Sequence, residues 1–431
     1  MLNERLIMDP IHGFINISEY PSIEKIVNSR YFQRLRRISQ LGLTHTVYPS
    51  ATHTRFSHSL GVMHVFLTLF DSLYKKNTEI GNNEKDMLRQ LGSVACLLHD
   101  LGHGPFSHLS ESIFCNGKFN HLKMSCEIIK GPEISDILTT HISPDAPKII
   151  ISLLKGEQVS GDYSLISQLI SSQLDADRLD YLIRDSYFTG VNYGSVDISR
   201  ISKTLAIWNK DTQFKGSAII RQKGVSAIED YIMGRYLMYK KVYYHKTVRC
   251  MEKLVEIAFK YAINEKLFKP PHSKGDFFQD EKFLEFDDNS LLSQLKKWTT
   301  HDNVTLKDLS KRIIERNPLK SMELSVTNMH NKNKMIEESF KKSLTEKGYS
   351  PDHYYFNDSL SISSYKPYNP LQGDDEKSVT NQIMVEDNEQ LIEISEKSKI
   401  IEALSNNAES SIFYFFPKEF YNGFAEMFKM K

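Results

Sequence analysis

A chain of 431 residues is long enough for one large domain and a smaller one, and its 54 basic and 54 acidic side chains leave no net formal charge at pH 7. This balance argues against a protein that coats long nucleic acid or an anionic membrane, although nucleic acid as a local partner is not excluded. The four cysteines form no CxxC pair, which is typical of reduced thiols rather than of disulfides or a zinc knuckle. No apolar segment resembles a signal peptide or reaches transmembrane length, so we expect a cytoplasmic protein without a membrane partner.

The first predicted helix covers residues 23–41, where apolar side chains recur at helical spacing. Ser22 can cap this helix and Gly42 can end it. Its arginines form either a solvated basic face or an anion contact, and the sequence leaves both readings open. A second, longer helix is predicted to begin near Arg55, and it carries His58.

The pattern of residues 86–101 predicts an apolar helix that ends on an adjacent histidine and aspartate, His99 and Asp100. Neighbouring helical residues point about 100° apart, so an imidazole and a carboxylate there can approach one ion from two sides. This pair is only half of a metal site, and the other ligands must come from elsewhere in the chain. A glycine-rich turn follows, and then a segment that begins at His108 and contains Glu111.

A further helix is predicted from about residue 164 to residue 188. Asp177, Tyr181 and Asp185 are spaced four residues apart and therefore share one face of this helix. Three polar groups in register on an otherwise apolar helix suggest a lined cavity. The alternative, in which the aspartates form salt bridges with neighbouring arginines of the same helix, is equally compatible with the pattern.

The helix predicted over residues 226–260 repeats this arrangement with basic and aromatic groups. Arg235, Tyr239 and Tyr243 have the same four-residue spacing, and several lysines lie nearby. Such a face suits a phosphate chain together with a base or a sugar. An ordinary basic helix on the surface of the protein is the alternative.

Composition changes near residue 270, where prolines and a glycine mark a boundary between residues 1–265 and residues 266–431. We expect a mainly α fold, with a helical core in the first part and a smaller helical and α+β region in the second. Helices are predicted near 281–298, 305–316, 331–347 and 398–405, and β-like segments near 353–365, 381–387 and 410–417. The sequence has no phosphate-cradling P-loop and no dinucleotide-binding glycine signature.

Two histidines and two aspartates from three predicted helices form a candidate metal-ligand set: His58, His99, Asp100 and Asp177. Mixed imidazole and carboxylate ligands suit Mn, Fe, Ni, Zn or Mg, and they leave positions for water and a phosphate oxygen. A divalent metal lowers the pKa of its water and so supplies a nucleophile for attack on phosphorus. The expected reaction is therefore hydrolysis of a phosphate ester.

Such a reaction also needs a proton donor for the departing oxygen and cations for the charge that develops on phosphate. His108 and His121 have suitable chemistry for a proton donor, and Glu111 could orient one of them or raise its pKa. Three arginines could supply the positive charge, namely Arg55, Arg178 and Arg235.

An ordered set of motifs resembles the HD-domain phosphohydrolases, and specifically their branch of deoxynucleoside triphosphate triphosphohydrolases. The resemblance to bacterial members extends over nearly the full chain. The motifs that carry it are DPIHGFI (9–15), YFQRLRRISQLG (31–42), HTRFSHSLG (53–61), LLHDLGHGPFSH (97–108), DADRLDYLIRD (175–185), RYLMYKKVYYHK (235–246) and FLEFDD (283–288). An HD-domain core within residues 1–265 is therefore expected.

Residue by residue, the resemblance implies the same four metal ligands and assigns further roles. The positions that match those around the scissile phosphate are His103, His108, Glu111 and His121. The positions that match contacts to the nucleotide are Gln40 and Leu41 beside the deoxyribose, and Arg55, Arg178, Tyr181, Asp185, Arg235, Tyr239 and Tyr243 near the triphosphate and sugar. Asn28 and Leu122 depart from the family pattern, the first at an activator site and the second beside His121.

The reaction implied by the resemblance is hydrolysis at the α-phosphate of a dNTP, which yields a deoxynucleoside and inorganic triphosphate. The resemblance also implies a homo-oligomer, either a dimer or a tetramer, whose state depends on an allosteric effector nucleotide. Two alternatives stay open: an HD-type phosphodiesterase or nuclease that acts on other nucleotides or single-stranded nucleic acid, and a nucleotide-binding scaffold with a vestigial site. The sequence specifies neither the base preference nor the native metal.

Overall fold

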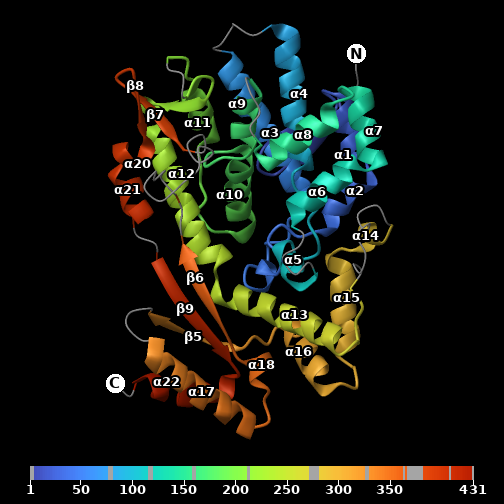
Figure 1. Ribbon diagram of the computed structural model, residues 1–431, viewed down its shortest axis with the longest axis vertical. Helices are drawn as coiled ribbons and strands as arrows, with labels where there is room; N and C mark the ends of the chain where they lie inside the picture. The colour runs from blue at the N-terminus through green and yellow to red at the C-terminus, as the bar shows by residue number, and fades with distance from the viewer. Residues whose placement is uncertain are drawn as a thin grey trace.

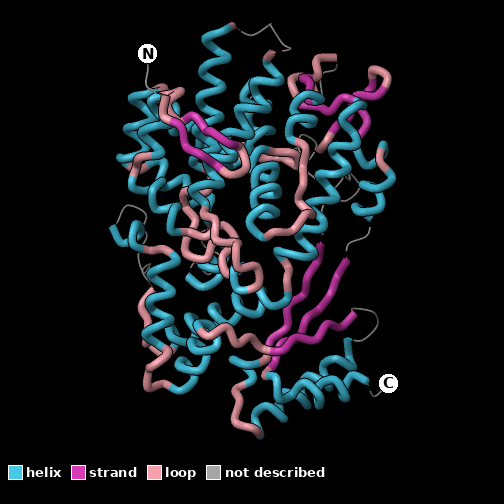
Figure 2. Tube along the Cα trace, turned by 180° about the vertical axis from the view of Figure 1, so that it is seen from behind, coloured by secondary structure: helices cyan, strands magenta, loops and turns pink. Residues whose placement is uncertain are grey.

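The computed structural model describes residues 4–75, 81–114, 120–157, 162–210, 214–270, 281–325, 330–362, 365, 382–406 and 409–429. Most of this described chain is helical, which confirms the predicted mainly α fold, and its strands form small sheets (Figures 1 and 2). Within it, every helix falls short of the length or the apolar character that crossing a lipid bilayer requires. Its three cysteines are buried and free, whereas Cys115 lies outside the described residues.

The elements up to residue 204 are almost entirely helical after an initial hairpin. They are β1 (Leu6–Asp9), β2 (Gly13–Asn16), α1 (Pro21–Val27), α2 (Arg30–Arg34), α3 (Arg55–Tyr74), α4 (Asn82–Leu98), α5 (His108–Phe114), α6 (His121–Lys130), α7 (Pro132–His141), α8 (Ala146–Lys155), α9 (Asp162–Ile170), α10 (Ala176–Thr189) and α11 (Ile198–Thr204).

The remaining elements alternate helices with short strands. They are β3 (Leu205–Ile207), β4 (Ala218–Arg221), α12 (Val225–Met238), a π-helical turn (Tyr239–Tyr243), α13 (Lys246–Asn264), α14 (Glu281–Glu285), α15 (Asp288–Trp298), α16 (Val304–Ile314), β5 (Lys320–Ser325), α17 (His330–Glu346), α18 (Pro351–Tyr354), β6 (Phe356–Ile362), β7 (Met384–Asp387), β8 (Gln390–Glu393), α20 (Ile394–Lys397), α21 (Lys399–Asn406), β9 (Glu409–Phe416) and α22 (Tyr421–Lys429).

Helix α3 is the centre of the helical core because its buried residues occur on nearly every side. Helices α4 and α10 both pack against it. Glycines allow these close approaches: a Cβ atom on Gly92 would lie 2.0 Å from the ring of Phe66, and one on Gly61 would lie 2.0 Å from Asp180 Oδ1. The crossing of α3 with α10 brings together residues that are more than 100 positions apart in the chain, and the candidate site forms there.

Four helices predicted as continuous are interrupted, and one of them, helix 281–298, divides into α14 and α15, which Asp287 caps. Helix 23–41 divides into α1 and α2 because the Ser29 hydroxyl accepts a hydrogen bond from the N–H of Phe32 and so caps a new helix. The predicted ends also differ: Ser22 lies inside α1 instead of capping it, and the last helical turn ends before Gly42. Helix 164–188 divides into α9 and α10, which Asp175 caps. Helix 226–260 divides at the π-helical turn. The apolar periodicity continues through each break, so it did not reveal these caps.

Short strands form a hairpin and two sheets. Several of these strands were not predicted from the sequence. β1 and β2 form the hairpin, β3, β4, β7 and β8 form a second sheet, and β5, β9 and β6 form a third. In the second sheet, β4 and β7 pair in parallel, with Ile220 opposite Val385. Helices α17 and α22 pack on the third sheet through Phe340, Phe424 and Phe416. Of the predicted boundary residues, Pro271 and Gly275 lie outside the described residues, and the division at residue 265 stays a prediction.

Candidate active site

The four predicted metal ligands converge where α3, the C-terminal end of α4 and the first turn of α10 meet. His58 Nε2 lies 3.0 Å from Asp177 Oδ1 and 3.7 Å from Asp100 Oδ2. His99 Nε2 lies 3.3 Å from Asp100 Oδ1 and 3.8 Å from Asp177 Oδ1. One nitrogen or oxygen atom from each of His58, His99 and Asp177 can be chosen so that all three lie within 4.8 Å of one another.

The outer hydrogen bonds of both histidines turn the Nε2 atoms toward this point. His58 Nδ1 donates to Asp180 Oδ2 at 2.8 Å, and His99 Nδ1 donates to the carbonyl oxygen of Cys96 at 2.7 Å. His99 Nε2 is buried and makes no hydrogen bond. Two imidazoles and the Asp177 carboxylate directed at one point, with Asp100 beside them, fit a divalent cation once His58 has lost a proton.

The protonation states of these ligands depend on the charged groups packed around them. Although burial disfavours the charged imidazole, hydrogen bonds with Asp177 and Asp180 raise the pKa of His58 to about 10. Despite the same burial, Arg55 and the nearby histidines hold the pKa of Asp100 well below its ordinary value. A cation must therefore displace a proton from His58, and its affinity is expected to fall as the pH falls.

A second group of side chains lies beside the first: His103, His108, Glu111 and His121. His121 Nδ1 is 2.8 Å from Glu111 Oε1, and His108 Nδ1 is 3.5 Å from the same oxygen. The rings of His103 and His121 stack at 4.0 Å between centroids. His103 Nε2 also lies 3.3 Å from Asp100 Oδ1, so this residue joins the two groups.

This second group contains both neutral and charged members. Burial and the neighbouring Arg55 hold the pKa of His103 well below its ordinary value, so its imidazole is neutral. Burial alone would raise the pKa of Glu111, but hydrogen bonds from His108 and His121 lower it strongly, so its carboxylate is ionised. The carboxylate can hold the ring of an attached histidine in place, which suits a proton donor.

Glycines make the tight turn before His108 possible. A Cβ atom on Gly102 would lie 2.3 Å from both the carbonyl oxygen of His121 and the backbone nitrogen of Ser125. A Cβ atom on Gly104 would lie 2.4 Å from Ser110 Oγ. The glycine-rich pattern in the sequence therefore reflects the close approach of α5 and α6 to this turn.

A cavity of about 480 Å³ opens beside the two groups. Arg55 links it to the metal-ligand set, because its guanidinium forms an ion pair with Asp100 while its Nε donates to Ser107 Oγ at 2.9 Å. Eight of the predicted catalytic and nucleotide-contact residues line the cavity: Gln40, Leu41, Arg55, His108, Tyr181, Asp185, Tyr239 and Tyr243.

Two predicted contact residues do not line the cavity. Arg178 forms an ion pair with Asp175 and donates to the carbonyl oxygen of Ser172. Arg235 Nη1 donates to Gln173 Oε1 at 3.1 Å. Neither aspartate on the predicted polar face pairs with a helix neighbour: Asp177 faces His58, and Asp185 accepts hydrogen bonds from His53 Nε2 and the Tyr243 hydroxyl at 2.7 and 2.8 Å.

Several residues of the site have no clear signal in the sequence. The pattern around His53 indicates only an incidental histidine, yet its buried side chain holds Asp185. Arg249 and Glu252 on α13 line the cavity just beyond the motif that ends at residue 246, and Asp358 on β6 lines it from a part of the chain far from every motif. Periodicity does not reveal these residues because only the packing of β6 against α13 brings them to the cavity.

Comparison with known proteins gives two family matches. A model of the HD domain matches residues 55–185, and a model of the HD-associated region matches residues 196–347. The first match contains all four members of the candidate metal-ligand set.

Relatives and solved structures match over larger parts of the chain. The uncharacterized protein YwfO of Bacillus subtilis is 32% identical, with 96% of this chain and 93% of that protein covered. The deoxynucleoside triphosphate triphosphohydrolase SAMHD1 of Homo sapiens is 30% identical over 59% of this chain, which corresponds to 44% of the human protein. A phosphohydrolase from Bacteroides thetaiotaomicron has a TM-score of 0.77 and 28% identity, with 96% of this chain and all of that chain covered.

Proposed function

We propose that this chain, which belongs to the HD-domain family of phosphohydrolases, hydrolyses deoxynucleoside triphosphates to deoxynucleosides and inorganic triphosphate. The family implies a divalent metal and a phosphorylated substrate. The observation that carries the finer proposal is the position of Arg55, which contacts the metal-ligand set through Asp100 and also lines the cavity. A cavity of about 480 Å³ is within the usual range for a small-molecule site.

The proposed metal ligands are His58, His99, Asp100 and Asp177. When bound there, a divalent cation supplies Lewis acidity and a nucleophile at neutral pH. The side chains prepare the site by holding two imidazoles and two carboxylates in place, and His58 gives up a proton when the cation binds. Arg55 adds a fixed positive charge, which suits the negative charge of the transferred phosphoryl group.

In the proposed reaction, water attacks the α-phosphorus and the bond from phosphorus to the deoxyribose 5′ oxygen breaks. The departing 5′ oxygen then takes a proton. His121 and His108 are the proposed donors, because ionised Glu111 accepts a hydrogen bond from each. His103 stays neutral and packs between His121 and Asp100.

The proposed nucleotide site is the cavity itself. Gln40 and Leu41 would contact the deoxyribose, while Tyr181, Tyr239 and Tyr243 would contact sugar and phosphates, as the family resemblance implies. Asp185 would act as a hydrogen-bond acceptor that His53 and Tyr243 hold in place. Contacts from Arg178 and Arg235 to substrate stay predictions, as do an effector nucleotide, a dimer or tetramer, and a cytoplasmic location.

The test is an assay of the four dNTPs, singly and mixed, against Mn²⁺, Fe²⁺, Ni²⁺, Zn²⁺ and Mg²⁺, with products identified by mass. Asp177→Asn is expected to lower turnover by more than about 100-fold, beyond the usual effect of substitutions outside the first coordination sphere. Asp136→Asn, an exposed position on α7, is the matched control and should retain activity.

Inorganic triphosphate among the products would support the proposal. Release of nucleoside monophosphate from cyclic or single-stranded substrates, without triphosphate, would instead identify a phosphodiesterase or nuclease. Turnover that persists in Asp177→Asn protein after its metal is lost would contradict the proposed mechanism.

A further inference from the structure

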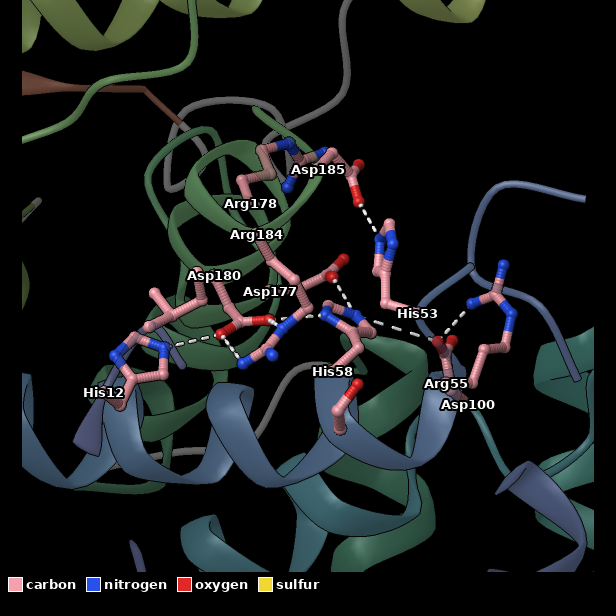
Figure 3. Close-up of polar contacts among 12 residues, drawn as sticks. His12, His53, Arg55, His58, Asp100, Asp177, Arg178, Asp180, Arg184 and Asp185 are labelled. Carbon is pink, nitrogen blue, oxygen red and sulfur yellow. Dashed lines mark hydrogen bonds and ion pairs between the residues drawn. The ribbon is translucent and has the colours of Figure 1, made fainter. Parts of the chain in front are cut away.

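A buried carboxylate outside the proposed ligand set lies directly behind one of its histidines. Asp180 follows Asp177 by three residues on α10, and its side chain is inaccessible to solvent. Its Oδ2 accepts a hydrogen bond from His58 Nδ1 at 2.8 Å, and its Oδ1 accepts one from His12 Nε2 at 2.6 Å. Figure 3 shows His58 between Asp180 on one side and Asp177 and Asp100 on the other.

Arg184 completes the surroundings of this carboxylate. It lies one helical turn after Asp180, and its Nε and Nη2 donate to the two carboxylate oxygens at 2.8 and 2.9 Å. Asp180 therefore accepts hydrogen bonds from donors on three sides.

The hairpin turn between β1 and β2 holds this arrangement from the other end. Arg184 Nη1 donates to Asp9 Oδ2 at 2.7 Å. Asp9 Oδ1 accepts the backbone N–H groups of Ile11 and His12 at 2.9 and 3.0 Å, so the same residue shapes the turn that carries His12. The DPIHG segment of the sequence thus reaches the metal-ligand set through two successive layers of hydrogen bonds.

The close packing of α3 on α10 leaves Asp180 little freedom. Gly61 faces it from α3, and a Cβ atom there would lie 2.0 Å from Asp180 Oδ1 and 2.3 Å from Arg184 Nη2. The carboxylate is therefore confined by shape as well as by hydrogen bonds. Nothing in the proposed reaction uses Asp180, His12 or Arg184 directly.

We propose that Asp180, braced by His12 and Arg184, is a positioning residue that fixes the ring and tautomer of His58 for metal binding. A hydrogen bond from Nδ1 to a carboxylate keeps the proton on that nitrogen, leaves the Nε2 lone pair for the cation and strengthens it as a donor. This inference rests on the metal centre of the proposed function, but it does not depend on the identity of the substrate.

The test compares Mn²⁺ affinities by isothermal titration calorimetry after the purified protein has been stripped of metal, without nucleotide. Asp180→Asn is expected to bind Mn²⁺ about 10- to 100-fold more weakly than the parent, as is usual when the partner of a ligating histidine is changed. The visible spectrum of Co²⁺-loaded protein should change too, since the ligand field depends on the orientation of His58.

Asp185→Asn is the matched control. Asp185 lies on the same helix and also accepts a hydrogen bond from a buried histidine, but His53 is not a proposed ligand. Its substitution should leave Mn²⁺ affinity unchanged, whatever it does to nucleotide binding. An equal loss of affinity in both variants would show a general disturbance of α10 and would overturn the inference.

His12→Ala provides a second variant that leaves Asp180 and Arg184 in place, and thermal unfolding of metal-free protein verifies that each variant is folded. We expect affinity to fall about three- to tenfold in this variant, less than for the direct partner of the ligand. Parental affinity in folded Asp180→Asn protein, or in His12→Ala protein if the first variant does not fold, would overturn the inference. A parent that binds Mn²⁺ but hydrolyses no dNTP would refute only the proposed function.

Discussion

Two glutamates in and near the cavity titrate in opposite directions because their surroundings differ. Glu111 accepts hydrogen bonds from two histidines, which outweigh the effect of burial and lower its pKa strongly. The Glu252 side chain is 23% exposed, yet partial desolvation raises its pKa from an ordinary 4.5 to about 7, although Arg249 opposes this shift at 3.0 Å. The number and charge of hydrogen-bond donors therefore decide which carboxylate is ionised at neutral pH.

The Glu252 shift predicts how stability depends on pH. A carboxyl group with a higher pKa in the folded chain binds protons preferentially in that state, so its contribution is complete below pH 4.5 and is lost as the pH rises through about 7. In Glu252→Gln protein, the loss of unfolding free energy from about pH 5 to about pH 8 should be smaller than in the parent, by at most about 3 kcal/mol. Urea denaturation at a series of pH values measures this difference.

Glu256→Gln is the control for this experiment. Burial raises the pKa of Glu256, but hydrogen bonds from Lys260 and Lys253 lower it by more. Its pKa is therefore below the ordinary value, and the group titrates below the pH range tested. Its substitution should not flatten the pH dependence. Identical profiles for the parent and Glu252→Gln protein would contradict the assignment.

Among the elements, strand β6 has a role that its sequence does not reveal. Phe356, Asn357 and Asp358 line the cavity, although they lie far along the chain from the candidate metal ligands. Asp358 accepts hydrogen bonds from Arg249 Nε and Nη2 on α13 at 2.7 and 3.4 Å. The C-terminal region therefore forms part of the wall of the proposed nucleotide site.

Asp358→Ala is expected to weaken dNTP binding by about 1 kcal/mol, or roughly fivefold, because it removes the tie that holds β6 against α13. Mn²⁺ affinity should not change, since Asp358 contacts none of the proposed ligands. Equilibrium binding of a non-hydrolysable dNTP analogue measures the first quantity and calorimetry the second. Unchanged nucleotide affinity would show that β6 is only a boundary of the cavity.

Across the full chain, the proposed metal centre joins segments that are distant in sequence. His58 lies on α3, His99 and Asp100 at the end of α4, and Asp177 on α10. A cation held by these residues binds the folded chain and not the unfolded one, so binding must stabilise the fold. A cation bound at the proposed site would therefore cross-link the helical core.

Removal of metal by a chelator is therefore expected to lower the Tm by a few degrees, which corresponds to about 2.7 kcal/mol at a free metal concentration 100 times the Kd. Readdition of Mn²⁺ should restore the Tm of the parent. Differential scanning calorimetry measures both changes. Asp177→Asn protein should show a much smaller response, and a response equal to that of the parent would place the stabilising ion elsewhere.

The mainly α fold and the residues that carry the family resemblance could be predicted from the amino-acid sequence. This prediction was possible because helical periodicity and the His99–Asp100 pair are local properties of the chain. The same local patterns did not reveal where helices break: Ser29 and Asp175 cap new helices inside runs whose apolar spacing continues across the cap. They also could not show whether Arg178 and Arg235 face the cavity, since that depends on the packing of α10 and α12.

Which polar groups meet, by contrast, depends on long-range packing. Asp180, His12 and Arg184 occur in segments separated by up to 175 positions when Asp9 is included, and no spacing rule connects them. They meet because Gly61 lets α3 approach α10 and because the β1–β2 turn closes over the same point. A buried charge needs hydrogen-bond partners in place of the water it has lost, and only the folded chain brings those partners together.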